Sequence, residues 1–440
     1  MKKTLLLIFI TSCLSAHAQL WTPKATGFNQ VNRGVDDISI VDDNVIWAKA
    51  YDGASNTPQN VRQFTKSIDG GNTWTSGNIN LGTGQNTLNI SSITAVSSTT
   101  AWASAIPSPT GSGGVWKTAD GGTTWTKQTT ALFDTEDSFA NLVYFWDENN
   151  GITQGDPSAG YFEIYTTTNG GTTWTRVPTA NIPTPLANEY GYAVNYDVVG
   201  NTIWFGTDKG RIFKSINQGL NWTATQSPIA DFGGTVSGSY SFSDANKGLL
   251  YASTGILYKT INGGTTWTVQ TYTGNIGNRN IEYIPGTSKI VSVGTTPNAS
   301  VSYTAYSTDD GLTWTEAMSG TQVTTLKFKN ENLGFGGGFT ISSTSGGIFK
   351  YNNTVLGTDD FTTTKNLMAY PNPTSGLLSI SGNNFSEIKI FDMTGKQVMA
   401  RKVSASDRLN LDVSALSSGI YLLNTVDNSG STSTLKFSKQ

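Results

Sequence analysis

Cysteine and histidine are almost absent from this sequence, and charged residues are few. Cys13 and His17 are the only residues of their kinds, and Asp, Glu, Lys and Arg make up 13% of the 440 residues. Cys13 and His17 both lie in an N-terminal segment that we expect to be removed. The mature chain would then lack Ser-His-Asp and Cys-His nucleophiles, disulfides and zinc sites built on His or Cys. Any catalysis would use carboxylates, Tyr, Lys or Arg, and we expect no cofactor, although oxygen-bound calcium stays open.

Long apolar runs and basic runs are missing as well. The apolar run at residues 5–10 follows two lysines and precedes small residues that end in Ala-His-Ala at 16–18. This pattern predicts a secretory signal peptide over residues 1–18, and the run is too short to span a bilayer. A lipoprotein signal with Cys13 as the lipidated residue is the alternative. Because the net charge is −3 and no Arg-rich run occurs, we expect neither a nucleic-acid partner nor a transmembrane segment.

Tryptophan, in contrast, is frequent and regularly spaced. The stretch SIDGGNTWT at Ser67–Thr75 returns five more times, at intervals of 45 to 51 residues. The tryptophans of the six copies are Trp74, Trp125, Trp174, Trp222, Trp267 and Trp314. Each interval also contains an apolar hairpin and a third apolar segment with Asp, Asn and Gly at the turns. A period of this length in strand-like sequence predicts four-stranded propeller blades.

The number of strands predicts how the ring closes. Seven hairpins and seven third strands occur, but after Tyr351 the expected Trp is missing. The segment from Leu20 contains Trp21 and is similar to the fourth strands elsewhere, at 53 residues before Trp74. We therefore predict an all-β fold with a seven-bladed propeller over residues 19–353, in which the N-terminal strand completes the last blade. Six blades is the alternative.

The repeated motif, Ser/Thr-x-Asp-x-Gly-x-Thr-Trp, resembles the Asp-box, also called the bacterial neuraminidase repeat. This motif is shared by sialidases, sortilin-type receptors and photosystem II assembly-factor-like propellers, so the resemblance implies a fold more than an activity. At the Asp position the copies have Asp69, Asp120, Asn169, Asn217, Asn262 and Asp309. An amide keeps the turn-forming oxygen but loses the charge. We interpret the motif as a structural clip between third and fourth strands.

The loops on the opposite face of such a propeller usually bind the ligand. The long segments from Asn78, Ala131 and Val177 place most of this loop mass in blades two to four. Their acidic and aromatic residues, with those of the shorter loop from Gln154, are Asp134, Glu136, Asp137, Asp156, Glu189 and Tyr190. Asp156 and Glu189 with Tyr190 could hydrolyse a glycoside or bind calcium. The plain alternative is solvated loop charge, and we assign no metal site.

The resemblance to sialidases can be tested on the arginines, because sialidases hold the substrate carboxylate with three of them. The predicted propeller contains only Arg33, Arg62, Arg176, Arg211 and Arg279, and the Arg-Ile-Pro signature is absent. The segment from Phe242 is more similar to the photosystem assembly-factor-like group, which implies a non-enzymatic protein that binds other macromolecules. We therefore favour a module that binds an extracellular protein or glycan over a carboxylate-dependent glycan hydrolase.

From about Lys365 the period ends and a different pattern begins. The segment resembles the type A sorting domain of the type IX secretion system of Bacteroidota. The residues that carry this resemblance include Tyr370, Pro371, Asn372, Pro373, Gly376, Gly395, Gly419, Lys436 and Lys439. It implies a linker at 354–366 and a small Ig-like β-sandwich at 367–440 that binds the outer-membrane translocon. The protein would pass through the periplasm and be released or attached to surface lipopolysaccharide; an ordinary carbohydrate-binding or adhesive sandwich is the alternative.

Overall fold

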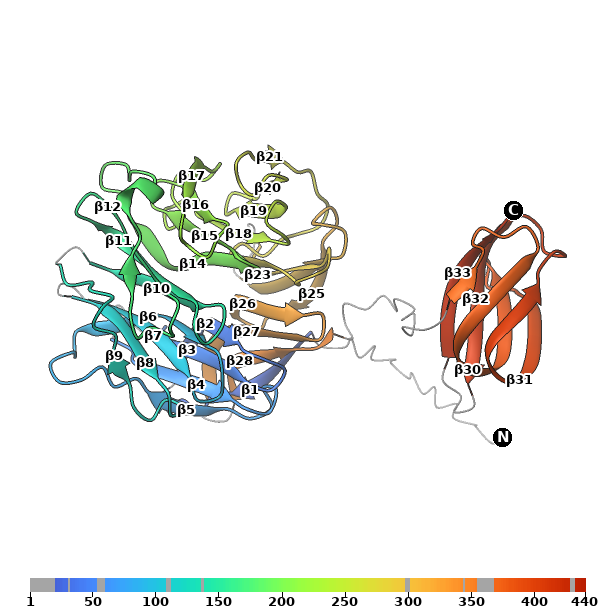
Figure 1. The fold of residues 1–440 in the computed structure, drawn as a ribbon, viewed down its shortest axis with the longest axis horizontal. Helices are drawn as coiled ribbons and strands as arrows, with labels where there is room; N and C mark the ends of the chain where they lie inside the picture. The colour runs from blue at the N-terminus through green and yellow to red at the C-terminus, as the bar shows by residue number, and fades with distance from the viewer. Residues whose placement is uncertain are drawn as a thin grey trace, which may run out of the picture. The chain divides into compact units, whose positions relative to one another are not determined.

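The computed structural model describes residues 20–30, 32–53, 60–107, 112–135, 138–296, 301–342, 345–353, 368–427 and 432–440. The predicted signal peptide, the predicted linker and the candidate site residues Glu136 and Asp137 lie outside the described residues. The chain divides into two compact units, Met1–Leu356 and Gly357–Gln440. In Figure 1 the first unit runs from blue to orange and the second is red.

The first unit is built almost wholly of antiparallel strands, as the period-2 apolar patterns predict. Each of five sheets has four strands in chain order. They are β6 (Leu88–Ala95), β7 (Ala101–Pro107), β8 (Gly114–Thr118) and β9 (Thr126–Lys127), then β10 (Ala140–Phe145), β11 (Gly151–Ser158), β12 (Tyr161–Thr167) and β13 (Thr175–Arg176). Next come β14 (Gly191–Val199), β15 (Thr202–Thr207), β16 (Arg211–Ser215) and β17 (Thr223–Gln226). The last two are β18 (Gly238–Phe242), β19 (Gly248–Ala252), β20 (Leu257–Thr260) and β21 (Thr268–Val269), and β22 (Asn280–Tyr283), β23 (Ile290–Thr295), β24 (Ser302–Ser307) and β25 (Thr315–Ser319). The described residues contain one short 3-10 turn, η1 (Thr179–Asn181).

A sixth, eight-stranded sheet joins the two ends of this unit. Its strands are β1 (Trp21–Ala25), β2 (Arg33–Ile40), β3 (Ile46–Asp52), β4 (Gln63–Ser67), β5 (Thr75–Asn78), β26 (Val323–Asn330), β27 (Leu333–Ser342) and β28 (Ser345–Tyr351). The order is β1-β28-β27-β2-β3-β4-β5, with β26 beside β27. The N-terminal strand β1 pairs with β28 from Trp21 opposite Tyr351 to Ala25 opposite Gly347. Between β2 and β27 the register contains a single pair, Gly34 and Phe339.

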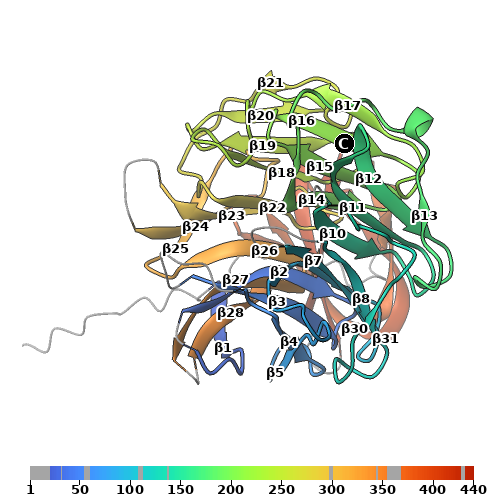
Figure 2. The same ribbon diagram turned by 90° about the vertical axis from the view of Figure 1, so that its left-hand side faces the viewer.

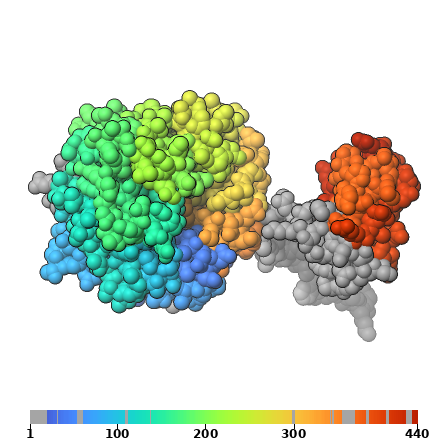
Figure 3. Space-filling view, viewed as in Figure 1, coloured from blue at the N-terminus to red at the C-terminus, as the bar shows by residue number. Residues whose placement is uncertain are grey.

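The sheets stand around a common centre. Figure 2 shows first strands such as β14, β18 and β22 on the inside and last strands such as β17 and β21 on the outside. The core lies between neighbouring sheets, where for example Trp47 and Phe64 of one sheet share a buried cluster with Ile90 and Trp116 of the next. In the space-filling view, side chains close the spaces between the ribbons (Figure 3). This arrangement is propeller-like.

Polar side chains tie several inner strands to their neighbours, where no backbone ladder joins them. Asp37 Oδ2 accepts the Ile93 backbone N–H at 2.8 Å, and Asp197 Oδ2 accepts that of Phe242 at 2.7 Å. Ser241 Oγ does the same for Tyr283 at 3.0 Å. Buried N–H groups need an acceptor, so these residues are part of the frame.

The second unit is a five-stranded antiparallel sheet. Its strands are β29 (Met368–Tyr370), β30 (Leu377–Asp392), β31 (Gln397–Asp412), β32 (Gly419–Asp427) and β33 (Thr432–Lys439). The long strand β30 pairs with β29 through its first residues, with β32 through its last, and with β31 along its other edge. Alternate side chains such as Ile388, Ile390, Leu423 and Phe437 are buried together. The turn at residues 393–396 joins β30 to β31 as a hairpin.

Candidate functional site

The six repeats form the same hydrogen-bonded loop between third and fourth strands. In the first copy, Asp69 Oδ1 accepts the backbone N–H groups of Asn72 and Thr73 at 3.0 and 2.9 Å, and Oδ2 accepts the Thr73 hydroxyl at 2.6 Å. These bonds from Thr73 lower the pKa of Asp69. In the second copy, the corresponding bonds from Thr124 lower the pKa of Asp120 to about 2. The carboxylates are thus occupied within their own loops.

The three copies with asparagine form the same hydrogen bond from the side-chain oxygen to the backbone N–H four residues ahead. Asn169, Asn217 and Asn262 each accept the backbone N–H four residues ahead through Oδ1, at 2.9, 3.0 and 2.9 Å. Each loop is also bonded to the turn between the first and second strands of its own sheet, as where Gly70 N donates to Asn44 O at 2.9 Å. The loop geometry therefore depends on an oxygen acceptor and not on a charge.

The tryptophans that close the motif lie between sheets. Five of them are at most 9% exposed, and Trp267 is half-buried. Trp74 packs edge-on against Phe335 of β27 with 5.6 Å between ring centroids, and Trp125 packs similarly on Phe64 of β4 at 6.0 Å. Trp74 Nε1 also donates to the Gly71 carbonyl at 3.2 Å, which joins the ring to its own loop. These aromatic contacts stabilise the junction between neighbouring sheets.

Among the predicted loop-face residues, Glu189 is the most deeply buried. It is 3% exposed and bonded by Arg211 through both carboxylate oxygens. Thr207 Oγ1 and the Leu186 backbone N–H also donate to it, at 2.7 and 2.8 Å. Burial alone would raise the pKa of Glu189, but the bonds from Arg211, Leu186 and Thr207 lower it overall. The carboxylate holds the loop before β14 onto β15 and β16.

Asp156 and Tyr190 lie close together, whereas Asp134 is exposed and has no hydrogen bond to either of them. Asp156 Oδ1 accepts Asn141 Nδ2 at 2.7 Å and the Gly191 N–H at 2.9 Å. Burial raises the pKa of Asp156 to about 7. The Tyr190 side chain is 43% exposed and stands edge-on to Tyr192 at 5.4 Å. The structure thus turns one carboxylate inward and presents an aromatic ring outward.

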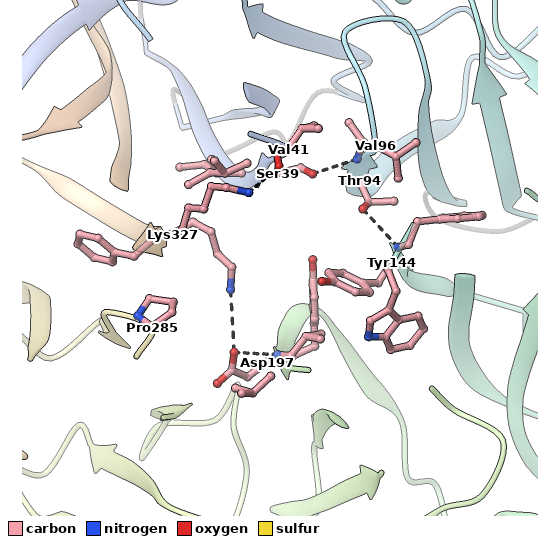
Figure 4. A pocket seen from close by; sticks show the side chains of 18 of the residues that line it. Ser39, Val41, Thr94, Val96, Tyr144, Asp197, Pro285 and Lys327 are labelled. Atoms are coloured by element: carbon pink, nitrogen blue, oxygen red, sulfur yellow. Dashed lines mark hydrogen bonds and ion pairs between the residues drawn. The ribbon is translucent and has the colours of Figure 1, made fainter. Parts of the chain in front are cut away.

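A cavity of about 680 Å³ lies elsewhere, where the inner strands end. Its rim includes Val41, Val96, Trp146, Val199 and Pro285, which come from the ends of five inner strands or the turns that follow them. These turns are the ones bonded to the motif loops, so the cavity opens on the face of the clips. Figure 4 shows the labelled side chains converging on it. The sequence predicts ligand-binding features on the opposite face, and no local pattern in it indicates this cavity.

The wall of this cavity combines an ion pair with aromatic rings. Lys327 of β26 places Nζ at 3.0 Å from Glu282 Oε1 of β22 and at 3.9 Å from Asp197 Oδ1 of β14. Figure 4 shows Lys327 and Asp197 facing each other across the space. Burial would lower the pKa of Lys327, but the two carboxylates raise it. Tyr144 also lines the cavity and contacts Trp146 and Tyr196 edge-on at 5.0 and 6.3 Å.

The residues of the predicted sorting motif lie in turns and strands of the second unit. Asn372 joins the entry turn to β33, because its Oδ1 accepts the Ser438 N–H at 2.9 Å and its Nδ2 donates to Lys436 O at 3.1 Å. Gly395 has φ +83° in the turn between β30 and β31, a backbone conformation that favours glycine. Tyr370 is 52% exposed, and Lys439 is buried. The exposed turn and the basic strand are therefore connected.

Comparison with known families identifies the second unit. Residues 368–440 match the family described as "Secretion system C-terminal sorting domain". The match covers the second unit and not the propeller-like unit. It marks the chain as a protein exported by type IX secretion to the outside or the outer cell surface, which confirms the predicted localisation. The described residues contain no helix that is long and apolar enough to cross a membrane. No group of three or more Asp, Glu, His or Cys side chains among them is placed to hold a metal ion.

Comparison with solved structures supports the fold of the first unit. The structure titled "YCF48 bound to D1 peptide" is similar with a TM-score of 0.51 and 14% identity, over 76% of this chain and 97% of that one. YCF48 from Cyanidioschyzon merolae gives 0.51 and 18%, over 76% and 99%. PorZ from Porphyromonas gingivalis, a surface component of the type IX system, gives 0.47 and 14%, over 92% and 59%. No curated protein matches the chain significantly. The two YCF48 structures show that the first unit has a propeller-like all-β fold.

Proposed function

We propose that this protein is a non-enzymatic binding module that acts outside the cell and holds an extracellular protein or glycan. The observation that carries the proposal is the orientation of the loop-face side chains. Glu189 is enclosed by Arg211, and Asp156 by Asn141 and Gly191, so both carboxylates serve the frame. A glycosidase would need two carboxyl groups free to reach the sugar.

The exposed side chains of the same face suit binding. Tyr190 is 43% exposed, and Leu186 nearby in the same loop is 49% exposed. Leu132, in the preceding loop of this face, is 51% exposed. Tyrosines with one free face are frequent where proteins bind their partners, because they bury a large area at a small entropic cost. We call Leu132, Leu186 and Tyr190 the loop-face patch. A propeller of similar fold has been solved with a peptide bound, which supports a polypeptide as one ligand class.

The proposal includes a closed ring of seven blades over residues 19–353, with the motif loops as Asp-box clips. Three contacts between distant segments support it. Strand β1 pairs with β28, Trp74 packs on Phe335, and Lys350 Nζ lies 3.3 Å from Asn72 Oδ1. The last two contacts join the β26–β28 group to the β2–β5 group in the way that other neighbouring sheets are joined.

The proposal also assigns the ends of the chain. Residues 1–18 are a signal peptide, 354–366 a linker, and 367–440 an Ig-like sorting domain that binds the translocon. The sorting domain is removed on export, and the propeller is released or attached to surface lipopolysaccharide. The family match of residues 368–440 supports the sorting domain and its role in export.

The loop-face patch can be tested directly. The mature protein, immobilised, is exposed to solubilised surface proteins and to a glycan array, and the same is done with Leu186→Ser/Tyr190→Ser. The matched control is Ile216→Ser/Ile261→Ser, whose side chains are 66% and 76% exposed on the clip face. We expect specific ligands to be lost from the loop-face variant only. Equal retention by both variants would place binding elsewhere and contradict the proposed site.

A glycan hydrolase is the second candidate, because the pKa of Asp156 is raised to about 7, in the range of a general acid. The discriminating experiment incubates the protein with a panel of polysaccharides and measures new reducing ends. Activity on any member that disappears in Asp156→Asn, with the fold intact, would replace the binding proposal by this one.

A further inference from the structure

We call the cavity of about 680 Å³ where the inner strands end the central cavity. It opens on the face of the motif loops, whereas the loop-face patch lies on the opposite face, so the two sites are independent. Its volume is in the range of cavities that enclose a small ligand or a single side chain. The charges, the unbonded acceptors and the rings of its wall indicate which chemical group it suits.

The charged residues that line the central cavity are mostly acidic. They are Asp147, Glu148, Asp197, Glu282, Lys327 and Lys329, that is, four carboxylates and two ammonium groups. When all six are ionised, the wall has a net charge of −4 + 2 = −2. The ammonium group of Lys329 is turned to the rim, where Nζ donates to the Val41 carbonyl at 2.7 Å. A concave wall of one net sign attracts ions of the opposite sign, so the cavity favours a cation.

Glu282 supplies an acceptor for this cation. The residue is 9% exposed, and it lines both the central cavity and a smaller cavity of about 90 Å³ that shares Ile38, Tyr196 and Lys327 with it. Lys327 Nζ bonds Oε1 at 3.0 Å, but no donor among the described residues bonds Oε2. The Oε2 atom is not one of the fully enclosed polar atoms that lack a partner, so it keeps accessible surface. One oxygen of a nine-tenths buried carboxylate is therefore open to a donor.

The ion pair with Lys327 does not compensate for the burial of this carboxyl group. Burial raises the pKa of Glu282 to about 7, because the attraction of Lys327 only partly opposes the shift and the charge of Asp197 adds to it. Asp197 is occupied by the frame, since Oδ2 accepts the Phe242 N–H at 2.7 Å and Oδ1 the Val198 N–H at 2.8 Å. A second cation at Glu282 Oε2 would reduce the cost of burying the ionised carboxylate.

Tyr144 provides a second oxygen in the central cavity. Its hydroxyl group has no hydrogen bond to a described residue and, like Glu282 Oε2, is not fully enclosed. Figure 4 shows Tyr144 and Lys327 entering the space from opposite sides. The Tyr144 ring stands edge-on to Trp146 at 5.0 Å, and Trp146 Nε1 donates to the Gly200 carbonyl at 2.8 Å. The aromatic part of the wall is therefore held in place, and aromatic rings attract cations.

These acceptors select the form of the cation. An ammonium group has three N–H donors, which suit separate oxygens such as Glu282 Oε2 and the Tyr144 hydroxyl. A guanidinium binds a carboxylate best through both oxygens, but Lys327 already bonds Oε1. The half-buried Val41 and Val96 of the rim suit methylene groups. We propose that the central cavity binds a primary ammonium group on an unbranched alkyl chain, with the ammonium at Glu282 and Tyr144. A lysine side chain and a free alkyl amine both carry this group.

The test uses the mature protein and two probes, the tripeptide acetyl-Gly-Lys-Gly-amide and pentylamine, with binding measured by NMR titration. Glu282→Gln keeps the size of the side chain and removes the charge, so the affinity for both probes should fall about tenfold or more. Tyr144→Phe removes only the hydroxyl group and should weaken binding about threefold. Glu316→Gln, at an exposed residue of β25, is the matched control and should bind both probes as the wild type does. Tryptophan fluorescence during urea unfolding establishes that each variant is folded.

Modified probes give the outcomes that would overturn the proposal. The tripeptide with norleucine in place of lysine has an unbranched alkyl chain without the charge, and the trimethyl-lysine tripeptide keeps the charge without N–H donors. Both should bind about tenfold more weakly than the lysine tripeptide. Tighter binding of the lysine tripeptide than of pentylamine would assign the group to a polypeptide, and the reverse order to a free amine. No binding of either probe, equal binding of the norleucine or trimethyl-lysine tripeptide, or unchanged binding by Glu282→Gln would each reject the site.

Discussion

Trp21 Nε1 donates a hydrogen bond to Thr304 Oγ1 at 3.3 Å, although 283 residues separate the two positions. Trp21 begins β1, whereas Thr304 lies in β24 of the neighbouring sheet. The indole is fully buried and also contacts Phe328 and Tyr351, with centroids at 6.3 and 6.0 Å. The start of the described chain is therefore part of the packing between the β22–β25 sheet and the eight-stranded sheet.

Removal of this side chain should weaken the whole propeller-like unit. We expect Trp21→Ala to lower the free energy of unfolding by about 3–5 kcal/mol, because a large buried side chain is replaced by a cavity. Urea unfolding followed by tryptophan fluorescence measures this unit alone, since all twelve tryptophans lie at or before position 314. Ile261→Ala, at a residue 76% exposed, is the control and should change little. A loss below 1 kcal/mol would mean that β1 is not needed for stability.

Glu189→Gln should lower the free energy of unfolding. The substitution leaves the Arg211 guanidinium half-buried without its counter-charge, which we expect to cost about 3 kcal/mol. Glu148→Gln, at an exposed residue, is the matched control. The same unfolding measurement applies. If Glu189→Gln is as stable as the control, the ion pair with Arg211 is not structural, and the residue becomes available again as a functional group.

Because the Asp37 carboxyl is buried, we expect the stability of the protein to depend on pH. Burial raises its pKa from 3.8 to about 6, against the bonds from Ile93 and Ser92 and the charge of Lys49. The folded state therefore holds the proton more tightly than the unfolded state, so the contribution of Asp37 to stability falls as the pH rises from about 4 to 6. Asp37→Asn removes this loss, and its stability relative to the wild type should increase by about 2 kcal/mol between pH 4 and pH 7.

The measurement is a series of urea unfolding curves at several pH values. Asp43→Asn, which changes an exposed carboxylate, should run parallel to the wild type and serves as the control. Parallel curves for Asp37→Asn and the wild type would show that Asp37 is already ionised at low pH in the folded protein.

The motif loops should tolerate an amide but not the loss of the oxygen. Asp120→Asn keeps the acceptor for the Thr124 N–H, as Asn262 does for Thr266. Asp120→Ala leaves that N–H without its partner, so its midpoint of thermal unfolding should fall clearly below that of Asp120→Asn. Equal destabilisation by both substitutions would instead indicate that the charge matters, as in an ion site.

Export should depend on the second unit. A chain that ends at residue 367 should accumulate in the periplasm, because the family match begins at residue 368. Asn372→Ala removes both bonds to β33 and should reduce surface delivery, whereas Arg401→Gln, exposed on β31, should not. Cell fractionation with immunodetection gives the result. Normal surface delivery of the truncated chain would exclude a sorting role.

Local features were predictable because local forces produce them. The turn at Met393–Lys396 and the strands around it follow from alternating apolar residues and a glycine with positive φ. The loops of the motif follow in the same way, since Asp69 and Asn262 bond N–H groups within four residues. A side-chain oxygen close in sequence to its partner needs no tertiary contact to find it.

The candidate site was less predictable because its residues come from distant strands. Asp156, Glu189 and Arg211 were visible in the sequence, but nothing local indicates that Arg211 takes the Glu189 carboxylate. The cavity lined by Lys327, Asp197 and Glu282 was missed for the same reason. A comparison of the first strands of successive repeats would have shown these charged residues at positions that point to a common centre.

The sequence by itself determined the repeated strands, the hydrogen bonds within the motif loops and the export of this protein. Each depends on a short pattern, either alternation, an oxygen four residues from an N–H, or a C-terminal sorting signal. The tertiary structure alone decided which charges are available. Glu189 is buried and bonded to Arg211, whereas Asp134 of the same face stays exposed. The reason is that burial and ion pairing are set by neighbours across sheets, and these neighbours are distant in sequence.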